Sequence, residues 1–178
     1  IAYMSDRGSC WEIFSCTARG TGEIRLTTGK ESSLWPAWAP DGERILFVAE
    51  RGGKQDLYLM KHDGTEPKAL TNDRAWDGRP AWSPDGRWIA WPSEREGKMA
   101  IFVMDAAKGE ARRITPLQGE ADEPTWSPDG RRIAFVWNKD SFRELYVVDA
   151  DGRNLRRMTT LRGQIHTPAW SPYLPAKQ

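Results

Sequence analysis

Histidine and cysteine, which often carry out catalysis or bind metals, are few in this sequence, with two of each. The only histidines are His62 and His166, and there is no Gly-x-Ser-x-Gly, His-Glu-x-x-His or Cys-x-x-Cys spacing. The six-residue step from Cys10 to Cys16 spans roughly 20 Å if it is extended, too far for a disulfide. The segment "DADGRN" at 149–154 lacks the later acidic ligands of a calcium loop and is typical of a turn. We therefore expect no metal, no cofactor and no enzymatic activity.

Aromatic and charged residues in the expected loops are better candidates for function, because they do not recur where the rest of the chain repeats. A group of exposed aromatic side chains beside mixed charges is typical of a protein or peptide interface. Some of these tryptophans could instead only cap the ends of strands. The candidate partner-binding residues are Trp11, Trp35, Trp76, Arg79, Asp122, Glu123, Trp137, Phe142 and His166.

Two other functions are open from the residues alone. A carbohydrate or a cation could be held by Asp77, Asp122 and Glu123 with the neighbouring tryptophans, with or without catalysis. The chain could also be a structural fragment of a larger protein of the same architecture.

Composition excludes several classes of partner. The 178 residues carry a formal net charge of +1, which gives no reason to expect a nucleic-acid partner. No apolar run approaches the roughly 18 residues of a membrane helix, so we expect no direct insertion into a membrane. Tryptophan is unusually common, with 10 residues.

Four of these tryptophans reveal an internal repeat. Trp38, Trp82, Trp126 and Trp170 each follow Pro-x, and each successive pair is 44 residues apart. We interpret residues 1–178 as a single domain made of the repeats 1–44, 45–88, 89–132 and 133–176.

Each repeat predicts four short antiparallel strands, which we call A to D from the Pro-x-Trp phrase onward. The segments are four to six residues long, are rich in β-branched and aromatic residues, and end at Gly, Pro, Asp or Asn. Ser-Pro-Asp-Gly predicts the tight hairpin between strands A and B. Strands B and C are apolar on both faces, so both faces must be covered. The fold class we predict is all-β, a β-propeller of four 44-residue, four-stranded antiparallel blades with the tryptophans wedged between blades.

The last copy of the phrase, "PAWSPYLP", lacks the Asp-Gly of the hairpin. We expect its strand at 168–170 to pair with residues 1–4, so that the C-terminal strand closes the first blade. That pairing can occur within one chain or between two, which predicts either a monomer or a homodimer that shares a ring.

The phrases "PAWSPDGRWIAW", "DLYLMKHDG", "ELYVVDADG" and "RRIT" resemble the propeller repeat of the TolB family across essentially the whole chain. TolB-type propellers have six blades and follow an N-terminal α/β domain, whereas these 178 residues contain four repeats and no such domain. The resemblance implies a protein- or peptide-binding module that uses the loop face around a central channel. It also implies a periplasmic or other extracytoplasmic location.

Overall fold

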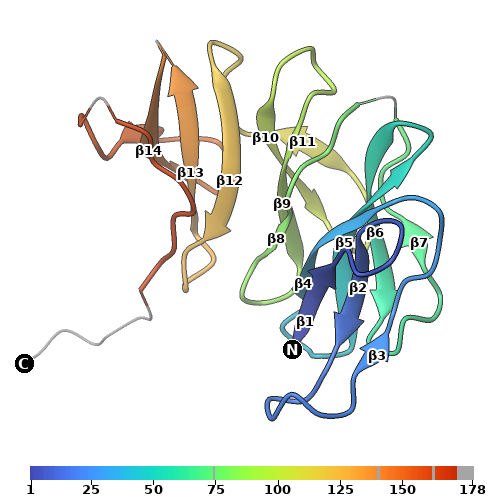
Figure 1. Cartoon of the computed structure of the whole chain (residues 1–178). Helices are drawn as coiled ribbons and strands as arrows, with labels where there is room; N and C mark the ends of the chain where they lie inside the picture. Colours follow the sequence, from blue (N-terminus) through green and yellow to red (C-terminus); the bar gives the residue numbers. More distant parts are fainter. Residues whose placement is uncertain (74, 140, 162, 172–178) are drawn as a thin grey trace, which may run out of the picture.

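The computed structural model describes residues 1–73, 75–139, 141–161 and 163–171. In this part of the chain every regular element is a β-strand, and the strands form four antiparallel sheets (Figure 1). The all-β prediction is confirmed. Among the described residues, no helix is long and apolar enough to cross a membrane.

Each sheet is one blade of a propeller, and the chain runs through each blade as a meander. Blade 1 contains β1 (Ala2–Ser5), β2 (Glu12–Ser15) and β3 (Ile24–Arg25). Blade 2 contains β4 (Ser33–Trp38), β5 (Arg44–Arg51), β6 (Lys54–Lys61) and β7 (Lys68–Ala69). Blade 3 contains β8 (Ala81–Trp82), β9 (Trp88–Ser93), β10 (Ala100–Asp105) and β11 (Ala111–Arg113). Blade 4 contains β12 (Glu120–Trp126), β13 (Arg132–Lys139), β14 (Phe142–Asp149) and β15 (Arg156–Arg157).

The hairpins between the first two strands of blades 2 to 4 have the predicted turn. Gly42, Gly86 and Gly130 have φ values of 74°, 68° and 68°, a left-handed conformation that glycine adopts without a steric penalty. The recurring Asp-Gly therefore sets the tight return from the first strand to the second.

Apolar side chains from neighbouring blades pack together and form the core. Separate clusters lie between blades 1 and 2, between blades 2 and 3, and between blades 3 and 4. The indole N–H of Trp82 donates to the carbonyl of Ala37 at 3.2 Å, and that of Trp126 donates to Ala81 at 3.2 Å. Each of these tryptophans thus joins its own blade to the preceding one, as the repeat predicted.

The predicted closure of blade 1 by the C-terminal strand is wrong for this structure. In the described residues blade 1 has three strands, ordered β1-β2-β3, and residues 168–170 pair with no part of β1. The indole N–H of Trp170 donates to the carbonyl of Thr125 at 3.1 Å. This hydrogen bond is equivalent to those that Trp82 and Trp126 make with the preceding blade. This contact places the last segment beside blade 4, away from β1, so the blades form an open arc (Figure 1).

Candidate functional site

In each repeat one residue directly precedes the proline of strand A, and these four residues lie close together near the axis of the arc. These residues are Trp35, Arg79, Glu123 and Thr167, which are 44 positions apart. Three of them, Trp35, Glu123 and Thr167, have positive φ values of 51°, 55° and 48°. A β-bulge at Trp35 and another at Glu123 shift the register of the strand pairing, so neither residue has a paired residue on the neighbouring strand.

These residues line one small pocket of about 190 Å³, which we call the axial pocket. Its lining contains five of the nine partner-binding residues predicted from the sequence. The residues that line it are Trp35, Trp76, Gly78, Arg79, Asp122, Glu123 and Thr167.

Two tryptophans form the aromatic wall of the axial pocket. The rings of Trp35 and Trp76 meet edge to face, with centroids 6.2 Å apart and planes at 75°. Trp76 is 38% exposed, so part of its ring is free to contact another molecule. A rigid aromatic surface of this kind offers a large contact area at a small cost in conformational entropy.

The two acidic residues that line the axial pocket, Asp122 and Glu123, both accept hydrogen bonds from other groups of the protein. Glu123 accepts hydrogen bonds from Arg143 at 3.0 Å and from the backbone N–H of Thr167, and it lies 3.3 Å from Nδ1 of His166. Burial raises the pKa of the neighbouring Asp122, and the charge of Glu123 raises it further. Both acids are therefore less available as negative charges than their number suggests.

Arg79 is the cation of the axial pocket. Its side chain is exposed, and no carboxylate oxygen of a described residue lies within 4.0 Å of its guanidinium. Beside the tryptophan wall, the pocket thus offers a positive charge that no described carboxylate pairs with.

Buried hydrogen bonds hold in place the segment that carries Trp76 and Arg79. Asp77 is 0% exposed and accepts hydrogen bonds from the hydroxyl of Thr71 at 2.7 Å and the indole N–H of Trp91 at 3.0 Å. The next residue, Gly78, donates its N–H to the carbonyl of Pro92 at 2.8 Å. A Cβ atom at Gly78 would lie 2.7 Å from Cγ of Pro92, so this close approach requires glycine.

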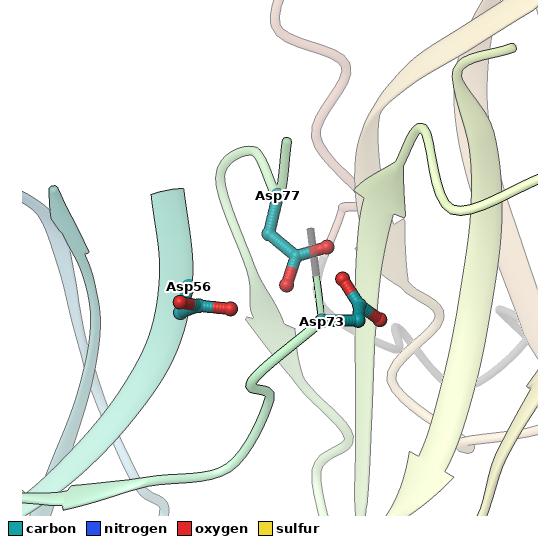
Figure 2. A group of neighbouring side chains, drawn as sticks. All are labelled: Asp56, Asp73 and Asp77. Atoms are coloured by element: carbon teal, nitrogen blue, oxygen red, sulfur yellow. The ribbon is translucent and has the colours of Figure 1, made fainter. Parts of the chain in front are cut away.

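Asp77 also belongs to a cluster of three carboxylates, with Asp56 on β6 and Asp73 in the connection after β7 (Figure 2). One oxygen from each lies within 4.8 Å of the others. Arg95 forms ion pairs with Asp73 at 3.3 Å and Asp77 at 3.5 Å, so the protein itself supplies a cation to the cluster. Burial, and then the charge of Asp77, raises the pKa of Asp56. These contacts give the cluster a structural role in fixing the wall of the axial pocket.

The other four predicted residues lie outside the pocket lining. Trp11 is 38% exposed and lines a separate, open cavity of about 480 Å³ beside blades 1 and 2. Trp137 is only 4% exposed and packs edge to face on Tyr146, so the exposure expected for it is wrong. Phe142 is half-buried at the start of β14, and His166 is exposed next to Glu123.

Sequence reasoning missed several residues that build the pocket. Thr167 could have been found, because it occupies the position before proline that Trp35 and Glu123 occupy in earlier repeats. Arg143 and Arg95 act through side-chain contacts with residues 18 or more positions away, and Thr71 also contacts Asp56, 15 positions away. No local sequence pattern signals such contacts.

The fold and the repeated blade contacts define the chain as a β-propeller repeat protein. Residues 1–141 match the model of the TolB β-propeller domain, and the chain belongs to that family. TolB from Acinetobacter baumannii is 28% identical with a TM-score of 0.79, and the match covers 89% of this chain and 40% of TolB. The structure of a putative TolB from Agrobacterium tumefaciens is 23% identical with a TM-score of 0.59, covering 80% of this chain and 67% of that one. No curated protein matches the sequence.

The comparisons also correct the prediction that the chain is not an enzyme. A puromycin-hydrolyzing peptidase from Mycobacterium tuberculosis shares the fold at 18% identity and a TM-score of 0.69, covering 84% of this chain and 25% of that one. An oligogalacturonate lyase in complex with manganese shares it at 16% identity and a TM-score of 0.67, covering 83% and 41%. Because chains of this fold include enzymes, the repeat architecture and the missing catalytic motifs do not support the prediction.

Proposed function

We propose that the chain binds a protein or peptide segment at the axial pocket. The observation that carries the proposal is the tryptophan pair Trp35 and Trp76 beside the guanidinium of Arg79, which has no carboxylate partner among the described residues. Tryptophan and arginine are the residues that most often dominate the binding energy of protein interfaces.

The size of the pocket supports a segment of chain as the ligand. Sites for drug-sized molecules usually enclose about 300–1,000 Å³. The axial pocket, at about 190 Å³, is smaller and fits a single side chain of a larger partner.

The charge of the pocket indicates which segment it prefers. Glu123 is held by Arg143 and His166, and the raised pKa of Asp122 disfavours its charged form, whereas Arg79 has no described carboxylate partner. We propose that the preferred segment presents an acidic side chain next to an aromatic or aliphatic one. The pocket lies within one chain, so the proposal is the same for a monomer and for a dimer.

We propose a periplasmic or other extracytoplasmic location from membership of the TolB propeller family alone. Fractionation of cells that express the natural gene tests this location directly.

A displayed library of random 12-residue peptides provides the probe for binding. Peptides selected on the wild-type chain should be enriched in Asp or Glu beside an aromatic residue. We expect Trp76→Ala and Arg79→Glu each to weaken the selected peptides at least about tenfold, the usual scale of an interface hot spot. Trp88→Ala is the control, because Trp88 is a half-buried tryptophan of β9 that does not line the axial pocket.

Two results would count against the proposal. Peptides that bind the Trp76→Ala and Arg79→Glu variants as tightly as the wild type would place binding elsewhere. Stronger binding of a neutral oligosaccharide such as maltohexaose, with no enrichment of acidic peptides, would favour the carbohydrate alternative.

A further inference from the structure

A second cavity lies between blades 1 and 2, and we call it the inter-blade cavity. Its volume is about 480 Å³. Its walls come from the connection between β1 and β2, from residues 30–32 before β4 and from the end of β5. Two neighbouring blades of the chain therefore build it together.

Hydrogen bonds to backbone groups fix the walls of the inter-blade cavity. The N–H of Ser33 donates to the carbonyl of Trp11 at 2.7 Å, which joins blade 2 to blade 1. Oε1 of Glu31 accepts the N–H of Gly52, in the turn between β5 and β6, at 2.7 Å. These contacts preorganise the cavity, and preorganisation lowers the entropic cost of binding a ligand.

The side chains of the inter-blade cavity suit a cation. The side chain of Trp11 is 38% exposed. The lining also includes the carboxyl groups of Asp6, Glu31 and Glu50 and one ammonium group, that of Lys30. No lysine, arginine or histidine of the described residues forms an ion pair with any of these three carboxyl groups. A guanidinium group is attracted both to the face of an indole ring and to carboxylates.

We propose that the inter-blade cavity binds an arginine side chain of the same partner segment that binds at the axial pocket. This inference rests on the function proposed above and deepens it. The axial pocket offers the guanidinium of Arg79, whereas the inter-blade cavity has three carboxyl groups and one ammonium group. A segment that carries an acidic residue for the first site and an arginine for the second matches both charges. Arginine fits better than lysine, because its planar group stacks on aromatic rings and pairs with carboxylates through two N–H groups.

The chain itself sets the spacing between the two sites. Ser32 lines the inter-blade cavity, and Trp35 lines the axial pocket three positions later on the same segment. At about 3.3 Å per residue, these two positions are about 10 Å apart. An extended peptide covers that distance in about three residues. The arginine of the partner should therefore stand about three or four positions from its acidic residue.

A small cationic probe tests the inter-blade cavity without any peptide. N-acetylarginine amide is added to the ¹⁵N-labelled chain, with N-acetylglutamine amide as the neutral control, and the indole N–H signals are followed. We expect the arginine probe to shift the signal of Trp11 in a saturable way and the neutral probe to leave it in place. Glu50→Gln removes one carboxylate and should weaken the binding of the arginine probe about threefold. Glu110→Gln is the matched control, because Glu110 is exposed and lines neither site.

Two matched peptides test the link with the axial pocket. A selected acidic, aromatic peptide is made with either arginine or glutamine about four positions from its acidic residue. We expect the arginine peptide to bind the wild type about fivefold more tightly than the glutamine peptide. This gain should disappear in Trp11→Ala, while the glutamine peptide binds both chains equally. Trp11→Ala keeps the hydrogen bond from Ser33, because that bond uses the backbone carbonyl of Trp11.

The two experiments separate this inference from the proposed function. A Trp11 signal that responds to neither probe would overturn the inference, whatever the peptide library yields. A gain from arginine that persists in both Trp11→Ala and Glu50→Gln would overturn it as well and would leave the axial pocket as the binding site. If no acidic peptide is selected and the arginine probe still shifts Trp11, the proposal for the axial pocket fails and the cation site in the inter-blade cavity is supported.

Discussion

Truncating two equivalent tryptophans should have very different effects on stability. Trp38 and Trp126 occupy the same position in the first and third repeats of the sequence, 88 residues apart, yet Trp126 is 6% exposed and Trp38 is 36% exposed. Trp126 also donates its indole N–H to Ala81 at 3.2 Å. We expect Trp126→Ala to lower the free energy of unfolding by about 3–5 kcal/mol, the usual loss for a large core aromatic.

The difference between the two variants follows from burial and from the hydrogen bond. A tryptophan side chain buries at most about 250 Å², so the 30% difference between 36% and 6% corresponds to about 75 Å². At about 25 cal/mol per Å² this area contributes about 2 kcal/mol, and the hydrogen bond adds about 1 kcal/mol. Trp38→Ala should therefore cost about 3 kcal/mol less than Trp126→Ala.

Urea unfolding followed by far-ultraviolet circular dichroism measures both losses without relying on tryptophan fluorescence. The wild type and both variants are unfolded at the same protein concentration. Equal losses of unfolding free energy for the two variants would refute the claim that Trp38 lacks the burial and the hydrogen bond that Trp126 has.

Three further predictions concern single contacts. Gly78→Ala should lower the free energy of unfolding in urea by about 1–3 kcal/mol, because the added Cβ would lie 2.7 Å from Cγ of Pro92. Gly163→Ala is the control and should be neutral, because a Cβ there would have no atom within 4 Å. Thr115→Val removes the hydroxyl that accepts a buried β10 N–H at 2.9 Å and should cost about 1–3 kcal/mol; a neutral result would mean that this N–H finds another acceptor. Because the pKa of Asp56 is raised in the folded protein, its ionisation opposes folding, and Asp56→Asn should gain stability relative to wild type as the pH rises above 3.8. Thermal melts from pH 3 to 8 measure this gain, and a difference between the two proteins that does not change with pH would contradict it.

The repeat made most of the fold predictable from the sequence. Spacing of 44 between the tryptophans fixed the blade length, and Asp-Gly fixed the turn at Gly42, Gly86 and Gly130. Closure was not predictable in this way, because a strand at 168–170 has the same local pattern whether it meets β1 or extends the arc.

The candidate site was predictable only in part. Trp35, Trp76 and Arg79 were found because they break the repeat in segments that surround the axis. Trp137 also breaks the repeat, but its ring packs inward on Tyr146, and sequence does not show which face a side chain takes next to a loop. The contacts of Glu123 depend on segments far apart in the chain and were not predictable.

The most direct test of the axial pocket uses the indole N–H signals of the 10 tryptophans in a ¹⁵N–¹H correlation spectrum. A selected acidic, aromatic peptide is added stepwise to the labelled chain. Binding at the pocket predicts that the signals of Trp35 and Trp76 shift first and most, while those of the buried Trp91 and Trp126 stay in place. Saturable binding that leaves Trp35 and Trp76 unshifted would contradict the proposed site.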